Sequence, residues 1–162
     1  MRRLIAALTV AALLVACDAQ RIEELVPGSS TESDVRKQFG EPVQIVERAD
    51  GSKSLEYPRQ PEGWTNYRMT IAADGKLATI EQLLTAENFA KVGPGMGQED
   101  VRRLLGRPAR TRNYALKPGE EHWDWRFMDG QVKKVFTVSF GAEQRVVSTA
   151  TGEDIKDTHT GG

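Results

Sequence analysis

The feature that most constrains the fold of this chain is an internal repeat with an offset of 66 to 67 residues. Residues 27–42 read PGSSTESDVRKQFGEP, and residues 94–108 read PGMGQEDVRRLLGRP, which is the same pattern with one residue deleted. Seven positions are identical: a Pro-Gly pair, an Asp-Val-Arg triplet, and the Gly and Pro of a Gly-x-Pro stop. A fixed internal period is typical of chains built from copies of one supersecondary unit. We therefore expect two such copies.

Weaker matches continue in the same order along both copies. Segment 22–25 aligns with 89–92, 55–57 with 123–125, 69–71 with 138–140, and 74–77 with 143–146. The copies then occupy residues 20–84 and 85–151. Each has about 65 residues, which is near the lower limit for independent folding. We therefore expect the two sheets to lie side by side or to share an edge, which would form one continuous surface.

Each copy begins with signals for two short helices. The first helices are predicted at Arg21–Val26 and, behind Thr85 as a cap, at Ala86–Val92. The second helix of the first copy opens at Thr31, where Thr31 and Asp34 resemble a capping box. Gly-x-Pro then ends it, because glycine adopts positive φ readily and proline cannot continue a helix. The predicted helix stops are Gly40, Pro42, Gly106 and Pro108.

Strands follow the helices in both copies. In the first copy they are predicted at 43–47, 67–71 and 77–84, separated by the turn signals Asp50-Gly51 and Asp74-Gly75. In the second copy, apolar residues alternate with polar ones over 123–127 and 136–140, which is the period of a half-buried strand. The predicted fold class is α+β, with two short helices on a three- to four-stranded antiparallel sheet in each copy. The polar residues 152–162 are expected to be disordered.

The first sixteen residues have the pattern of a targeting signal rather than of a folded element. Arg2 and Arg3 precede the apolar stretch Leu4–Val15, which is too short to span a hydrocarbon core of about 30 Å. This pattern favours a secretory signal peptide. Leu14-Val15-Ala16-Cys17 resembles the bacterial lipobox, which implies cleavage before Cys17 and acylation of that residue, with 17–19 as the lipidated N-terminus. The alternatives are an ordinary signal peptide with an incidental cysteine and a short transmembrane anchor.

Composition excludes several classes of function. The 22 basic and 23 acidic residues give a net charge of −1, which argues against nucleic acid as a partner. Cys17 is the single cysteine, so intrachain disulfides and cysteine-based zinc sites are excluded, and two distant histidines do not suggest a metal site. No cofactor and no small-molecule substrate are predicted.

The lipobox, the paired helices with their Gly-x-Pro stop and the aromatic antiparallel sheet together resemble the SmpA/OmlA (BamE-like) family of outer-membrane assembly lipoproteins. The resemblance covers residues 20–149 and implies a lipid-anchored, non-catalytic envelope scaffold on the periplasmic face of the outer membrane. The implied partners are the membrane, through the anchor, and an envelope protein such as the β-barrel assembly machine. Asp18 resembles the inner-membrane retention signal of enteric lipoproteins, which leaves the inner membrane as an alternative location.

Two features depart from that family. The chain carries two units where the family has one, and segment 18–30 lacks the family's tyrosine and Gln-Gly, so no lipid-contacting residue is carried over. Tandem units of this kind also resemble the β-lactamase inhibitor protein. That resemblance implies an alternative function, in which the lipoprotein binds and inhibits or regulates a periplasmic enzyme through a concave sheet surface.

Signals for catalysis are weak throughout the chain. His122 beside Trp123 reads as a sheet-face histidine, and the acids Glu120, Glu121 and Asp124 read more readily as a solvated edge than as an acid–base group. The glycine-rich segment 93–97 lacks the lysine of a phosphate loop. A basic run could face anionic lipid, or could be a solvated face; it comprises Arg102, Arg103, Arg107, Arg110 and Arg112.

Aromatic residues are the better candidates for partner binding. Tryptophan and tyrosine dominate the energetics of protein interfaces. The candidates are Trp64, which follows a proline-containing loop, and Tyr67, Trp123 and Trp125. The alternative interpretation is that these side chains pack in the core or against loops.

Overall fold

The computed structural model describes residues 18–113 and 118–154, which form two α+β units. The first unit contains residues 18–57 and Arg68–Glu81, and the second contains Pro58–Tyr67 and the described residues from Gln82 onward. This division corrects the predicted boundary after residue 84. Leu84 belongs to the core of the second unit, and Pro58–Tyr67 hydrogen-bonds with that unit, so both segments follow their tertiary contacts.

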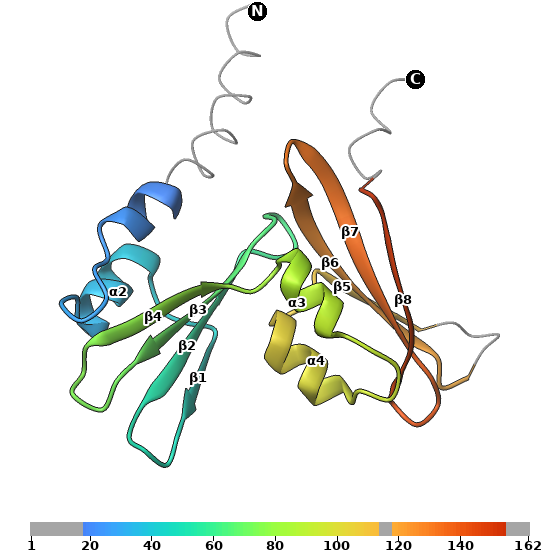
Figure 1. The fold of residues 1–162 in the computed structure, drawn as a ribbon, viewed down its shortest axis with the longest axis horizontal. Coiled ribbons are helices and arrows are strands. Elements are labelled where there is room, and N and C mark those ends of the chain that lie inside the picture. Colours follow the sequence, from blue (N-terminus) through green and yellow to red (C-terminus); the bar gives the residue numbers. More distant parts are fainter. Residues whose placement is uncertain (1–17, 114–117, 155–162) are drawn as a thin grey trace, which may run out of the picture. The chain divides into compact units, whose positions relative to one another are not determined.

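The first unit opens with helical residues 18–23, followed by α2 (Glu32–Phe39) and four strands (Figure 1). The strands are β1 (Gln44–Glu47), β2 (Lys53–Pro58), β3 (Asn66–Ile71) and β4 (Leu77–Gln82), in the order β1-β2-β3-β4. The first helix therefore ends before the predicted Val26. Pro27 explains this difference, because proline disfavours helical backbone in the preceding residue.

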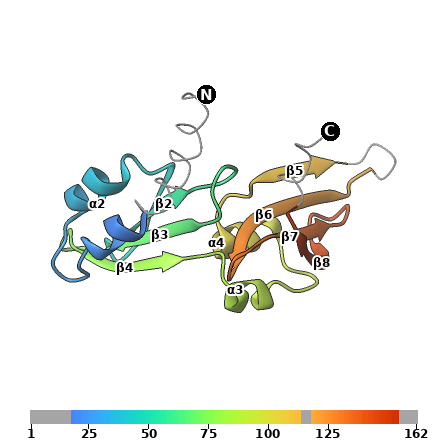
Figure 2. The same ribbon diagram turned by 90° about the horizontal axis from the view of Figure 1, so that it is seen from above.

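The second unit contains α3 (Ala86–Lys91) and α4 (Gln98–Leu105), followed by four strands (Figure 2). The strands are β5 (Arg110–Asn113), β6 (Glu121–Asp129), β7 (Val132–Phe140) and β8 (Val146–Glu153), in the antiparallel order β5-β6-β7-β8. The strands thus form two separate four-stranded sheets. Of the two predicted arrangements, sheets side by side or sheets sharing an edge, the shared edge is wrong for the described strands.

Local sequence signals explain where the helices begin. Thr31 caps α2: its hydroxyl accepts from Asp34 N at 3.3 Å, and its own N–H donates to Asp34 Oδ2 at 2.8 Å. The hydrogen bonds from the backbone and hydroxyl of Thr31 lower the pKa of Asp34. Thr85 caps α3 by accepting from Asn88 N, whereas Gly97 offers α4 no side-chain cap.

The same set of contacts fixes the helix ends in each unit. Gly40 and Gly106 follow α2 and α4 with φ of +80° and +73°, and with ψ near extended values rather than left-handed helical ones. Tyr57 Oη donates to the Gly40 carbonyl at 3.1 Å, and Trp125 Nε1 donates to the Gly106 carbonyl at 3.2 Å. Each helix stop is therefore bonded to an aromatic side chain of the sheet beneath it.

Alanine substitution of these two glycines should separate backbone strain from crowding. We expect Gly40→Ala to destabilise the first unit by about 1–2 kcal/mol, because only its φ is unfavourable and its Cβ would meet open space. Gly106→Ala should destabilise the second unit by about 2–3 kcal/mol, because its Cβ would also lie 3.1 Å from Asn66 Nδ2 and 3.2 Å from Leu83 Cδ1.

Urea unfolding measures this difference, because all three tryptophans lie in the second unit and their fluorescence reports on that unit. Gly106→Ala should lower the urea midpoint measured by fluorescence. Gly40→Ala should leave the fluorescence midpoint unchanged and should lower only the midpoint of the unfolding transition measured by circular dichroism. Equal losses for the two variants would contradict the close approach at Gly106.

Candidate functional site

The sheet of the second unit has two faces of different chemistry. One face packs on α3 and α4, where Phe89 lies 4.4 Å from Phe136 and 4.7 Å from Phe127 between ring centroids. The core on this side also includes Val101 and Leu105 from α4. The opposite side, which we call the pocket face, carries the alternate residues of the same strands, including Asp124 and Arg126 of β6.

Strand β6 departs from the predicted half-buried pattern, because its polar residues are buried as well. Asp124 is 2% exposed and Arg126 is 8% exposed, although both alternate with core aromatic residues. A charged side chain is stable at such depth only when it is paired and hydrogen-bonded. Asp124 meets this requirement through contacts with neighbouring strands, and Arg126 meets it through contacts with Asp154 and with the β2–β3 loop.

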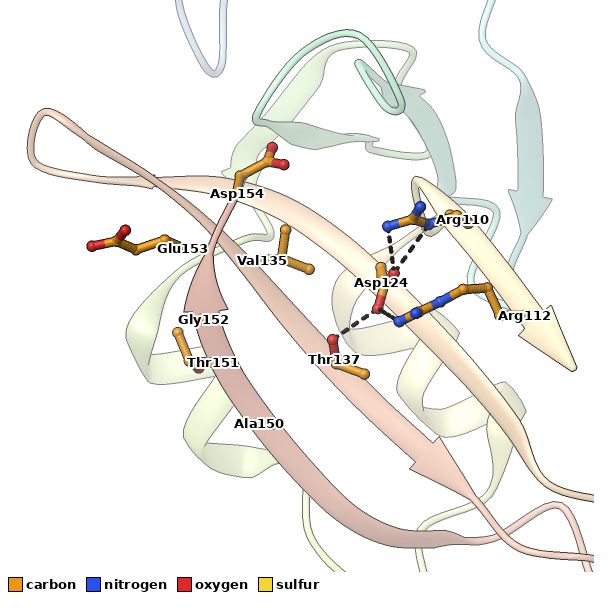
Figure 3. Close-up of a pocket in the computed structure, with 10 residues that line it drawn as sticks. All are labelled: Arg110, Arg112, Asp124, Val135, Thr137, Ala150, Thr151, Gly152, Glu153 and Asp154. Carbon is orange, nitrogen blue, oxygen red and sulfur yellow. Dashed lines mark hydrogen bonds and ion pairs between the residues drawn. The ribbon is translucent and has the colours of Figure 1, made fainter. Parts of the chain in front are cut away.

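Asp124 accepts hydrogen bonds from both neighbouring strands, β5 and β7 (Figure 3). Its Oδ2 accepts from Arg110 Nε at 3.2 Å, and Arg110 Nη2 lies 3.1 Å away. Its Oδ1 accepts from Arg112 Nη2 at 3.0 Å and from Thr137 Oγ1 at 2.7 Å. Register explains this convergence, because Arg110 and Thr137 are the Cα partners of Asp124 on β5 and β7. The buried carboxylate therefore orients two guanidinium groups.

These residues line a pocket of about 630 Å³ on the pocket face. Figure 3 shows the two arginines on one side of Asp124 and strand β8 crossing the other side of the pocket. Ala150 and Gly152 of β8 are the register partners of Thr137 and Val135. Their small side chains leave room above the sheet. The pocket therefore has a basic side, formed by Arg110 and Arg112, and a mostly apolar floor, formed by Val135, Thr137, Ala150 and Gly152.

A second buried ion pair closes one end of this face. Arg126 is paired through Nε with Asp154, and its Nη1 donates to the Pro61 carbonyl at 2.8 Å. Gln60 Nε2 donates to Arg126 O at 2.8 Å, while Gln60 Oε1 accepts from Arg126 N at 3.2 Å. These bonds attach the β2–β3 loop, residues 59–65, to β6.

This pairing corrects the prediction of a disordered tail from residue 152. Residues 152 and 153 extend β8, and Asp154 is 9% exposed. Pairing with β7 and the ion pair with Arg126 outweigh the weak strand propensity of the segment. The rest of the predicted tail, residues 155–162, lies outside the described residues.

The four aromatic candidates for partner binding occupy different environments. Trp125 is fully buried and Trp123 is 7% exposed, so both are core residues and the prediction that they contact a partner is wrong. Trp64 is half-buried, with Arg126 Cζ at 5.2 Å and Lys133 Nζ at 5.1 Å from its ring centroid. Tyr67 is also half-buried. Trp123 and Trp125 lie on the face of β6 that contributes to the core with α3 and α4, and Trp125 Nε1 donates to the Gly106 carbonyl at the end of α4.

The weaker candidates have structural contacts as well. Ser139 Oγ lies 3.3 Å from His122 Nδ1, and Glu121 accepts from Gln98 Nε2 at 2.7 Å. The basic run divides, because Arg103 pairs with Asp100 on α4 whereas Arg110 and Arg112 face Asp124. Within residues 18–113 and 118–154, no group of three or more histidine, cysteine, aspartate or glutamate residues could hold a metal.

Sequence reasoning missed the cluster of Arg110, Arg112 and Asp124 as a unit. The available signal was Asp124, a charged residue between two tryptophans of β6. Arg110 and Arg112, two positions apart, lie on the neighbouring strand β5. Cys17 lies outside the described residues. In the described part of the chain, the helices are all too short or too polar to cross a membrane.

Comparisons with known proteins give limited similarity. No family model matches the chain, and no curated protein matches it. One similar solved structure is an osmotically inducible lipoprotein, OsmE, with 25% identity and a TM-score of 0.38, covering 44% of this chain and 82% of that one. Another is a DUF4309 family protein, YjgB, from Bacillus subtilis, with 21% identity and a TM-score of 0.31, covering 80% of this chain and 82% of that one.

Proposed function

We propose that this chain is a lipid-anchored, non-catalytic protein of the cell envelope that acts by binding another protein. The observation that carries the proposal is the leader, in which Arg2 and Arg3 precede an apolar stretch that ends at the single cysteine, Cys17. The proposed location is the periplasmic face of the outer membrane. The inner membrane is the alternative because Asp18 follows the acylated position.

Within this class, we propose an accessory scaffold role in outer-membrane protein assembly or envelope integrity, with the β-barrel assembly machine as partner. The proposal includes a duplicated BamE-like unit. Support comes from corresponding contacts: the isolated bridge Thr31–Lys76 has a counterpart in Gly97–Arg145, in the register of the sequence repeat. The aromatic bonds to the two glycine carbonyls follow the same register.

A second candidate function is binding and regulation of a periplasmic enzyme through a sheet surface. The pocket face favours this candidate, because a polar sheet face with an oriented arginine pair offers a defined docking surface. Catalysis by the chain itself is not proposed. Asp124 and Glu121 each accept a hydrogen bond from a neighbouring side chain, Arg112 and Gln98 respectively.

The lipid anchor is directly testable. We expect Cys17→Ser to abolish incorporation of labelled fatty acid and to leave an uncleaved or mis-cleaved precursor, because the thiol is the acylated group. Metabolic labelling followed by immunoprecipitation measures both effects, with the unchanged chain as control. Normal acylation of Cys17→Ser would contradict the proposal.

Photo-crosslinking in the intact envelope, followed by mass spectrometry, distinguishes the two functions. The crosslinker is placed at the exposed pocket residue Ala150, with exposed Glu99 of α4 as the control position. Crosslinks to large subunits of the assembly machine from Ala150 support the scaffold. One stoichiometric enzyme supports the regulator, and the absence of any protein adduct would contradict both.

A further inference from the structure

We propose that the pocket on the second sheet binds a carboxylate side chain, aspartate or glutamate, flanked by apolar residues on a protein partner. The inference rests on the proposed protein-binding function and names the chemistry of the partner. It concerns Arg110, Arg112, Asp124 and the floor residues of β7 and β8.

The charge of the pocket matches a single negative charge. Within the cluster of Arg110, Arg112 and Asp124, two positive charges and one negative charge leave a net charge of +1 (2 − 1). The exposed Glu153 also lines the pocket, but its side chain lies on the side of β8 away from the two arginines (Figure 3). The neighbouring pair of Arg126 and Asp154 is neutral. A partner carboxylate would therefore complete the charge balance of this face.

The arginines are held in place before any ligand arrives. Asp124 is 2% exposed and fixes both guanidinium groups, while the Arg110 and Arg112 side chains remain 46% and 38% exposed. Guanidinium groups bind carboxylates through paired N–H donors, and a fixed fork loses little entropy on binding. The buried acid thus acts as a positioning residue for two accessible donors.

The floor favours a side chain on a protein over a free ion. Val135 lies beside Gly152 and Thr137 beside Ala150, so the floor offers apolar surface with little obstruction. The pocket, at about 630 Å³, is much larger than one anion needs. Three acidic residues line it, Asp124, Glu153 and Asp154, and their negative charges disfavour a doubly charged phosphate more than a singly charged carboxylate.

The test uses the full-length chain, isotopically labelled in zwitterionic detergent micelles and observed by NMR. The probe is a capped pentapeptide with glutamate between two valines, and its matched control carries glutamine instead. We expect the glutamate peptide to shift the amide signals of Arg110, Asp124 and Ala150 saturably. The glutamine peptide should bind about tenfold more weakly or worse, since charge-assisted hydrogen bonds are lost.

Variants separate the site from general charge effects. Arg110→Gln should weaken binding of the glutamate peptide about tenfold, whereas Arg103→Gln, with the same charge change on a side chain 71% exposed on α4, should not change it. Ala150→Leu keeps both arginines but fills the floor at an exposed position, and should also weaken binding of the glutamate peptide about tenfold or more. Unshifted amide signals outside the pocket show that each variant is folded.

Three results would overturn the proposal. One is equal binding of the glutamate and glutamine peptides, or no binding of either. Another is tighter binding of inorganic phosphate than of the glutamate peptide at the same signals. The third is a response of these signals to phosphatidylglycerol in the micelles that Arg110→Gln removes, which would assign the arginines to lipid. Each result leaves the acylation of Cys17 unaffected, so failure here is distinct from failure of the proposed function.

Discussion

Asp154→Ala is expected to lower the free energy of unfolding of the second unit by about 3–5 kcal/mol, the range for breaking a buried ion pair from one side. Arg126 is 8% exposed and Asp154 is 9% exposed, so water cannot replace the lost carboxylate around the guanidinium. Arg126 also holds the Pro61 carbonyl, and its loosening should release the β2–β3 loop. Urea unfolding followed by tryptophan fluorescence measures the loss.

Two control variants distinguish the loss of the buried ion pair from the effect of any substitution at the end of β8. Glu153→Ala alters the neighbouring exposed residue and should change stability by less than about 0.5 kcal/mol. Replacing both partners, as Arg126→Met with Asp154→Leu, should recover most of the loss because no unpaired charge is left buried. If Asp154→Ala behaves like Glu153→Ala, the ion pair does not form in solution.

Asn66→Asp is expected to destabilise the second unit by about 3–5 kcal/mol at neutral pH, although the two side chains have the same shape. Asn66 is 1% exposed, and its Nδ2 donates to the carbonyls of Leu105 at 2.8 Å and Arg107 at 2.9 Å. The substitution removes both donors and turns a negative charge toward two carbonyl oxygens. The substitution therefore removes the two hydrogen bonds by which β3 stabilises the end of α4 on either side of Gly106.

The pH dependence of this loss has a defined sign. Burial beside carbonyls raises the pKa of the introduced carboxyl above its unfolded value of about 3.9. The folded state then holds the proton more tightly, so the loss should be smaller at pH 4 than at pH 7. Asn113→Asp, at an exposed position on β5, is the control and should have little effect. A loss that does not vary with pH would contradict the buried geometry.

Local signals in the sequence determined the starts of α2 and α3, the glycine stops of α2 and α4, and the alternation of apolar residues along the strands. Thr31 and Asp34 form the predicted capping box, and Gly40 ends the helix as predicted. These predictions succeed because caps and alternation depend on residues within one turn of helix or one strand. Local signals failed at Val26, where the helix was predicted one turn too long.

The sequence by itself determined a lipobox-like leader and the order of elements, but only the tertiary structure decided which residues form the candidate site. Arg126 meets Gln60 across 66 residues of sequence, and Asp154 across 28. Arg110, Arg112 and Asp124 come together only when β5 pairs with β6. Contacts at such separations depend on strand register and on the energy of burying charge, and no local pattern encodes either. For the same reason Trp123 and Trp125, which suit a surface as well as a core, are placed in the core only by the packing of α4 on β6.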